Sequence, residues 1–269
     1  MDRSIASLDG RTAIVTGGAN GIGKGIAMGL AAFGANVVIA DKDGPAAQQT
    51  AAEIAKKGVR TLSYAVDVRE FDQVKAMTKA TLDTFGKINI LVNNVGGTFK
   101  SNFLDVAEKG WDALIRINLK SALYCTKSVA DEMIRLKTGG AIIQVTSIEA
   151  WRAAPGYAVY SACKAALENF TWTMALELAQ HNIRVNSIAP DVILTPGVPL
   201  GTKPEDRERY NRTIPLKRVG TIEDCAGAAV YLASDMSSFV TGQTIHVDGG
   251  NYASKGWIRD PSGTWVTGH

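Results

Sequence analysis

The chain has 269 residues, 46% of them apolar, and a formal net charge of +3, which argues for a folded core and against disorder or nucleic-acid binding. Its three cysteines lie far apart with no C-x-x-C pair, so they indicate neither a disulfide framework nor a metal site. No stretch reaches the roughly 18 apolar residues of a membrane-spanning helix, and the first residues lack the apolar core of a signal peptide, so we expect a cytoplasmic protein without a membrane segment.

Short apolar runs alternate with amphipathic segments along the chain. The runs predict strands at 12–16, 36–40, 61–66, 88–92, 141–146, 184–189 and 243–247. Helical patterns follow the first strand as far as Gly34 and recur at 45–57, 70–85, 111–136, 158–180 and 221–232. This alternation predicts an α/β fold: one domain with a doubly wound, Rossmann-type parallel sheet of about seven strands and helices on both faces. We place that domain at residues 1–250 and treat 251–269 as a C-terminal extension.

A glycine-rich turn directly follows the first predicted strand. Its candidate cofactor-binding residues are Gly17, Asn20, Gly21, Ile22 and Gly23. Strand, glycine turn and helix is the arrangement that places backbone N–H groups and a helix N-terminus against a pyrophosphate. The spacing is G-x-x-x-G-x-G rather than G-x-G-x-x-G, and an ordinary tight turn is the alternative.

Acidic residues end the second and third predicted strands. Asp41 is placed to accept hydrogen bonds from ribose hydroxyls and to repel a 2′-phosphate, which favours NAD over NADP, although Lys42 beside it would attract that phosphate. Asp67 is placed to accept a bond from the adenine amino group, with Val68 packing on the ring. These residues predict the adenosine half of a dinucleotide site.

Asparagines and glycines follow the fourth strand. Asn94 and Gly96 belong to an Asn-Asn-Val-Gly-Gly turn, where amide side chains tie down backbone and glycine admits a ligand; a plain polar turn is the alternative. Asn118 interrupts the helix expected at 111–136, and because asparagine is a poor helix former we expect a local irregularity there.

The fifth strand delivers Ser147 at its carboxyl end, and Tyr160 and Lys164 lie four residues apart on the next helix, hence on one face. At about 4 Å and an effective dielectric constant of about 20, an ammonium stabilises a phenolate by about 4 kcal/mol. We therefore expect Lys164 to lower the pKa of Tyr160 by roughly three units, from about 10 towards neutrality. A helix with a surface Tyr and Lys is the alternative for this stretch alone.

Taken together, these motifs resemble the short-chain dehydrogenase/reductase superfamily, in its single-domain branch of roughly 250 residues. The resemblance covers residues 8–250. It implies that Tyr160 is the general acid/base, that Ser147 positions the substrate oxygen, that Lys164 bonds the nicotinamide ribose, and that Asn118 holds a water of a proton relay. It also implies cofactor contacts at the sixth-strand end, from Pro190, Ile193 and Thr195.

The sequence departs from the family pattern at two positions: Val95 replaces an alanine, and Asp191 follows Pro190 where the family has glycine. We expect the first change to be tolerated and leave open whether Asp191 contacts substrate. The candidate substrate residues are Glu149, Trp151, Tyr157, Asp191 and Leu194.

The apolar character of this region predicts a lipophilic secondary alcohol or ketone, alicyclic or steroid-like, oxidised or reduced with NAD. Alternatives are a sugar or 3-oxoacyl substrate on the same fold, and a non-catalytic NAD-binding sensor or scaffold. Reduction of a C=C bond is disfavoured, since the family's enoyl reductases separate Tyr and Lys more widely. The long connection at 192–219 is the place of a substrate lid in this family. The resemblance also implies a homotetramer, built partly on 111–136 and 158–180. We expect the extension to pack on a neighbouring subunit or beside its active site, a frayed end being the alternative.

Overall fold

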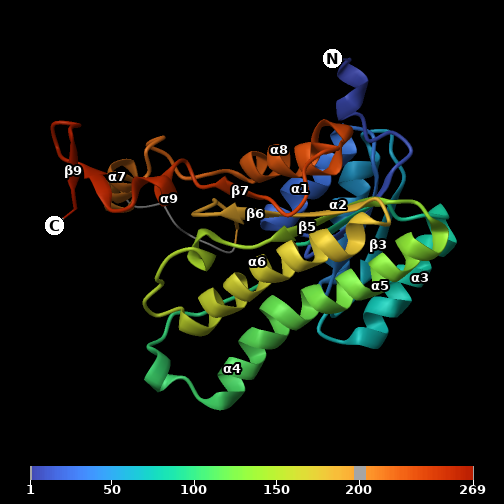
Figure 1. Ribbon diagram of the computed structural model, residues 1–269, viewed down its shortest axis with the longest axis horizontal. Helices are drawn as coiled ribbons and strands as arrows, with labels where there is room; N and C mark the ends of the chain where they lie inside the picture. Colours follow the sequence, from blue (N-terminus) through green and yellow to red (C-terminus); the bar gives the residue numbers. More distant parts are fainter. Residues whose placement is uncertain (1, 197–203, 269) are drawn as a thin grey trace.

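Seven parallel strands form the centre of this computed structural model, which describes residues 2–196 and 204–268 (Figure 1). In sequence order they are β1 (Thr12–Thr16), β2 (Asn36–Asp41), β3 (Thr61–Ala65), β4 (Ile90–Asn93), β5 (Gly140–Val145), β6 (Ile183–Pro190) and β7 (Thr244–Val247). Their order in the sheet is β3-β2-β1-β4-β5-β6-β7. The chain therefore reverses direction across the sheet between β1 and β4, which opens a crevice at the carboxyl ends of these strands.

Helices cover both faces of the sheet, as predicted. One face carries α1 (Gly21–Ala32), α2 (Gly44–Ala55) and α8 (Ile222–Ala233), and the other carries α3 (Phe71–Phe85), α5 (Ser121–Leu136) and α6 (Ala158–Ala179). Alternate residues of one strand serve opposite faces: Val37 and Ile39 join the first core, whereas Val38 packs in the second. Strands buried on both faces read as unbroken apolar runs, and this explains the sequence pattern.

The segment predicted as one helix at 111–136 is divided. It consists of α4 (Glu108–Ile115), a π-helical turn η3 (Arg116–Lys120) and α5. Asn118 lies in the π turn, so the irregularity expected at this residue is confirmed.

The chain beyond β7 adds structure that the sequence patterns did not predict. The extension forms α9 (Asn251–Ser254) and an antiparallel hairpin of β8 (Trp257–Arg259) and β9 (Trp265–Thr267). It lies with α7 (Pro204–Thr213) at one end of the molecule, at the left of Figure 1, and Arg212 Nε donates to the Arg259 carbonyl at 3.2 Å. Residues 197–203 of the expected lid lie outside the described residues.

Short 3-10 helices complete the described chain: η1 (Arg3–Ala6), η2 (Phe103–Asp105), η4 (Ile148–Ala150) and η5 (Asp235–Ser237). Among residues 2–196 and 204–268, no helix combines the length and the hydropathy needed to span a bilayer.

Candidate active site

The turn between β1 and α1 leaves no room for side chains. Gly17 and Gly21 have φ values of +62° and +55°, a region that glycine adopts readily. A Cβ at Gly23 would lie 2.1 Å from the Gly17 carbonyl oxygen. Asn94 holds the turn, because its Nδ2 donates to the carbonyls of Thr16 (3.0 Å) and Gly17 (3.2 Å). The bare backbone lies at the N-terminus of α1, where the helix dipole favours a phosphate.

The other two predicted residues of this turn have different surroundings. Asn20 is the N-cap of α1 but makes no side-chain capping bond. Ile22 is partly buried against the core on the α1 side of the sheet.

A cavity of about 240 Å³ opens at the carboxyl ends of β2, β3 and β4. The candidate residues that line it are Gly17, Asp41, Asp67, Val68, Asn94 and Gly96. Asp41 is fixed there by backbone donors, since its Oδ2 accepts from Ala19 N and its Oδ1 from Asp43 N, both at 3.1 Å. A carboxylate has about four lone-pair positions, so Asp41 keeps capacity for further donors such as ribose hydroxyls.

Two cations share this cavity with the carboxylates. Lys42 lines it, as does Arg69, which sequence analysis missed. Arg69 donates two hydrogen bonds to the Asp67 carboxylate, from Nη2 to Oδ2 at 2.6 Å and from Nε to Oδ1 at 2.9 Å. These hydrogen bonds hold the pKa of Asp67 below its usual range. The only signal for Arg69 in the sequence was its place two residues after Asp67. The bare glycines, the hydrogen-bonding carboxylates and the apolar Val68 together suit an adenosine and its phosphates.

The catalytic candidates meet where β5 faces α6. Ser147 follows β5 and begins η4, its Oγ accepting from Glu149 N at 3.2 Å. Tyr160 lies in the first turn of α6 and Lys164 one turn further on. Lys164 Nζ lies 5.7 Å from the centroid of the Tyr160 ring and donates to the Val145 carbonyl at 2.9 Å. Ser147 and Tyr160 also share a side-chain hydrogen bond.

The expectation that Lys164 lowers the pKa of Tyr160 is wrong for this structure. Burial raises the pKa of Tyr160, a hydrogen bond with Ser147 lowers it by less, and the Glu149 carboxylate raises it further. Lys164 is itself buried, at 3% exposure, and burial lowers its pKa to about 8. Desolvation is therefore the main cause of both pKa shifts, and it disfavours the charged form of each group.

Asn118, in the π turn, lies near Lys164 on the other side of Gly96. Its Oδ1 accepts from Gly97 N at 3.0 Å, and its Nδ2 donates to the carbonyls of Gly97 (2.7 Å) and Leu114 (3.0 Å). A Cβ at Gly96 would lie 2.9 Å from Asn118 Oδ1 and 3.2 Å from Lys164 Nζ. Glycine at position 96 therefore preserves the space between these two polar atoms.

The segment after β6 closes the site from the other side. Pro190 ends β6, and Ile193, which is buried, forms a β-bridge with Gly220. The methyl group of Thr195 lies against the glycine turn, since a Cβ at Gly21 would be 3.3 Å from it. Thr195 therefore lies beside this turn, and its contact with a nicotinamide cofactor stays a prediction.

Asp191 does not need the conformational freedom of the glycine usual at its position. Its φ is not positive, and its N donates to the Val247 carbonyl at 3.2 Å. Its carboxylate accepts from Asn251 Nδ2 at 2.5 Å and lies 3.7 Å from Arg152 Nη2. Burial is the main cause that raises the pKa of Asp191. Asp191 therefore ties the end of β6 to the first residue of the extension.

The predicted substrate residues are not gathered in one place. Trp151 lines a cavity of about 480 Å³ together with Arg152 and the extension, whereas Tyr157 lines a much smaller cavity of about 10 Å³ near η2. Glu149 is ion-paired with Arg152 at 2.9 Å. Leu194 is 44% exposed. Sequence analysis missed Arg152, although its place three residues after Glu149 is typical of an ion pair on a helical turn.

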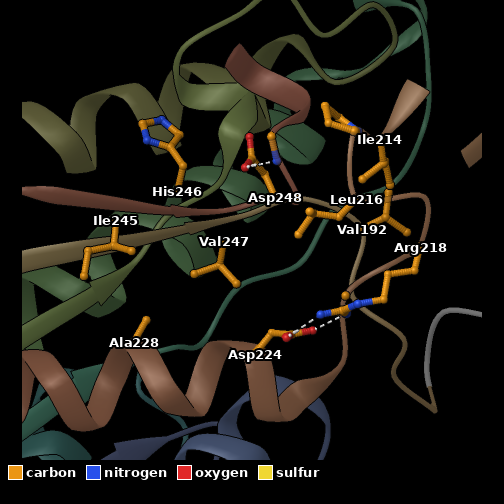
Figure 2. Close-up of a pocket in the computed structure, with 14 residues that line it drawn as sticks. Val192, Ile214, Leu216, Arg218, Asp224, Ala228, Ile245, His246, Val247 and Asp248 are labelled. Carbon is orange, nitrogen blue, oxygen red and sulfur yellow. Dashed lines mark hydrogen bonds and ion pairs between the residues drawn. The ribbon is translucent and has the colours of Figure 1, made fainter. Parts of the chain in front are cut away.

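Another cavity, of about 550 Å³, is lined by none of the catalytic candidates. It is enclosed by β7, the N-terminal half of α8 and residues 214–220 (Figure 2). Figure 2 shows Ile245 and Val247 pointing towards α8 and His246 pointing to the opposite side of the strand. The ion pair of Arg218 with Asp224, at 2.7 Å, stands at its edge.

Groups of three or more possible metal ligands are absent from the described part of the chain.

Comparisons with known proteins give consistent matches. A family model described as enoyl-(acyl carrier protein) reductase matches residues 17–251. The 3-oxoacyl-[acyl-carrier-protein] reductase FabG of Staphylococcus epidermidis is 39% identical over 245 residues, which cover 90% of this chain and 99% of the relative.

Solved structures agree with this match. A short-chain type dehydrogenase/reductase from Mycobacterium marinum has a TM-score of 0.87 and 34% identity, covering 92% of this chain and 98% of its own. A 7α-hydroxysteroid dehydrogenase with NADH and 7-oxo glycochenodeoxycholic acid has a TM-score of 0.88 and 35% identity, and the match covers 93% of this chain and 98% of that protein. An Agrobacterium tumefaciens protein with bound NADP has a TM-score of 0.86 and 33% identity, and the match covers 93% of this chain and 100% of that protein.

Proposed function

Because the chain belongs to the short-chain dehydrogenase/reductase superfamily, we propose that it interconverts a secondary alcohol and a ketone with Tyr160 as the general acid/base. The chain is an oxidoreductase of this type, and it binds a nicotinamide dinucleotide. The observation that carries the proposal is the meeting of three side chains between β5 and α6: the paired hydroxyls of Ser147 and Tyr160, with the Lys164 ammonium behind the phenol ring.

The bound dinucleotide supplies or accepts the hydride. In the reducing direction, Tyr160 donates its phenolic proton to the carbonyl oxygen as negative charge develops there, and Ser147 donates a hydrogen bond to the same oxygen. The raised pKa of Tyr160 keeps this proton in place at neutral pH. Lys164 and Asn118 flank the space left by Gly96, through which a water would return a proton from solvent.

NAD is the cofactor that Asp41 supports. Its carboxylate faces the cavity at the end of β2 and would repel a 2′-phosphate. Lys42 and Arg69 in the same cavity favour that phosphate, and the fold is found with NADH in one neighbour and with NADP in another. We assign NAD because Asp41 is held in place by two backbone donors, whereas Arg69 is engaged by Asp67.

The substrate class favoured by the comparisons is a 3-oxoacyl group, which was the alternative to the lipophilic alcohol expected from sequence. The support is 39% identity along nearly the whole length of a 3-oxoacyl carrier-protein reductase. A steroid-like ketone remains the second candidate because Trp151, Tyr252 and Trp257 line one cavity of about 480 Å³. The description of the matching family model points to C=C reduction instead, which the spacing of Tyr160 and Lys164 disfavours.

A substrate panel tests these assignments. We expect NADH oxidation with a 3-oxoacyl thioester or a 7-oxo steroid acid and none with a 2-enoyl thioester. Tyr160→Phe should lower kcat by about 10²- to 10⁴-fold while the Kd for NADH, measured by fluorescence, stays near that of the unaltered protein. Tight NADH binding with no turnover of any ketone or alcohol would instead support the sensor or scaffold alternative.

We also propose that the protein is a homotetramer. Light scattering, which measures the molar mass in solution, tests this proposal.

A further inference from the structure

The cavity of about 480 Å³ beside Trp151 is built largely by the C-terminal extension; we call it the extension cavity. Its lining residues are Trp151, Arg152, Thr213, Asn251, Tyr252, Ser254, Lys255, Gly256, Trp257 and Ile258. The match to the family model ends at residue 251, so most of this wall is formed by residues beyond that match.

The charged side chains that line the extension cavity are both cations. Arg152 pairs with Glu149 through Nε and Nη2, its Nη2 also lies 3.7 Å from Asp191, and its Nη1 has no hydrogen-bond partner among the described residues. Lys255 Nζ lies 3.4 Å from the centroid of the Tyr252 ring and forms no ion pair within residues 2–196 and 204–268. Lys255 therefore brings a cation without an ion-pair partner in the described chain to this cavity, and Arg152 adds the unused N–H donors of its Nη1.

Aromatic rings form the remaining wall and hold one another in place. Tyr252 stacks on His246 with ring centroids 4.9 Å apart, and Trp151 meets His246 edge-on at 5.5 Å. Trp257 is half-exposed at the outer side. Flat apolar walls with two cations suit a molecule that has an apolar body and an anionic end.

The extension cavity is linked to the catalytic candidates through intermediate side chains. Trp151 Nε1 donates to Glu168 Oε1 at 3.4 Å, and the same oxygen accepts from Thr146 Oγ1 at 2.5 Å. Thr146 immediately precedes Ser147 in the chain. Asn251 reaches Asp191 at the end of β6. Hydrogen bonds through Glu168 and Thr146 therefore link the cavity wall to the segment that carries Ser147.

We propose that the extension cavity binds the anionic end, a carboxylate or a phosphate, of the ketone or alcohol that reacts at Tyr160, with Arg152 and Lys255 as the recognising cations. This inference rests on the proposed function and deepens it by giving the substrate an acidic group. It assigns the extension to substrate selection.

Matched substrate pairs test the proposal. A 7-oxo steroid acid is compared with its methyl ester, and acetoacetyl-coenzyme A with acetoacetyl-N-acetylcysteamine, so that the two pairs separate carboxylate from phosphate as the source of the charge. We expect the anionic member of at least one pair to have a KM about tenfold lower, and Lys255→Met and Arg152→Gln each to remove most of that difference. Added salt should also reduce the KM difference between the anionic and neutral members of a pair.

Lys137→Met is the matched control, because Lys137 is another exposed lysine with a left-handed conformation (φ +55°, against +50° for Lys255) at a helix C-cap, at the end of α5. Lys137→Met should leave the KM values for both members of each substrate pair unchanged. Equal KM values within both pairs, or equal effects of Lys255→Met on anionic and neutral members, would overturn the proposal. Arg152 supports the buried Asp191, so Lys255→Met decides the matter if Arg152→Gln does not fold.

A binding measurement separates failure of this proposal from failure of the proposed function. Quenching of tryptophan fluorescence reports on Trp151 and Trp257 in the cavity wall and needs no turnover. If no ketone is reduced, tighter binding of the acid than of its ester, lost in Lys255→Met, still supports the anion site. Equal binding of the anionic and neutral members in both pairs refutes it.

Discussion

Asn118 holds both backbone polar groups of Gly97: its Oδ1 accepts from the Gly97 N–H at 3.0 Å, and its Nδ2 donates to the Gly97 carbonyl at 2.7 Å. The π-helical turn that carries Asn118 turns its amide towards the end of β4. An asparagine that is unfavourable for a helix is thereby used to fix the loop beside Lys164, and the adjacent Gly96 keeps an open space between the two side chains.

Gly96 and Gly97 offer a matched test of that space. A Cβ at Gly96 would lie 2.9 Å from Asn118 Oδ1 and 3.2 Å from Lys164 Nζ, whereas a Cβ at Gly97 would meet only Ile117 Cδ1 at 3.6 Å. We expect Gly96→Ala to lower kcat by about tenfold or more, because a proton relay contributes a sizeable share of general acid/base catalysis. Gly97→Ala should stay within about threefold of the unaltered enzyme. Equal kcat values for the two variants, measured by steady-state kinetics, would contradict a role for this space.

The pH dependence of ketone reduction should reflect Lys164 rather than Tyr160. Burial lowers the pKa of Lys164 to about 8, so its positive charge is present below that pH and is lost as pH rises through it. The pKa of Tyr160 is raised, so its proton remains in place over the same range. We expect kcat/KM for reduction to fall above a pH of about 8, and Lys164→Arg, which stays charged, to remove that fall from the residual activity. A profile in Lys164→Arg with the same fall would assign it to another group.

Cofactor preference should respond in opposite directions to two substitutions in the adenosine cavity. Asp41→Ser removes the charge that repels a 2′-phosphate, so we expect the preference for NADH over NADPH to fall by about tenfold in kcat/KM. Arg69→Gln removes a cation from the same cavity and should increase that preference. The two cofactors are compared with one ketone at low ionic strength, where the charge effects are largest. A change in the same direction for both variants would show that their charges do not govern the choice.

Two glycines of the packed helix pair α1 and α8 should have opposite effects on stability. A Cβ at Gly25 in α1 would lie 2.6 Å from Ile222 Cβ and 2.8 Å from its carbonyl oxygen, so Gly25→Ala should lower the free energy of unfolding by about 1–3 kcal/mol. Gly227 in α8 is exposed with nothing within 4 Å of its Cβ position, so Gly227→Ala should raise that free energy by roughly 0.5–1 kcal/mol. Denaturant unfolding measures both, and destabilisation by Gly227→Ala would contradict the packing described.

Much of the fold and the central residues of the candidate site could be predicted from the sequence because their signals are local. Alternating apolar runs and amphipathic segments specify a parallel sheet with two covered faces, and in such a sheet all strand ends meet at one edge. That rule alone brings Gly17, Asp41, Asp67, Asn94 and Ser147 to one side of the sheet, and helical spacing adds Tyr160 and Lys164.

Only the tertiary structure decided the properties that depend on burial and on distant contacts. The pKa of Tyr160 follows from how far packing removes water from it, which the spacing of a tyrosine and a lysine does not specify. The contact of Asp191 with Asn251 and the shared cavity of Arg152 and Lys255 join residues that are about 60 to 100 positions apart in the chain. No local pattern encodes such pairs, because they exist only once the extension folds back beside the turn after Ser147.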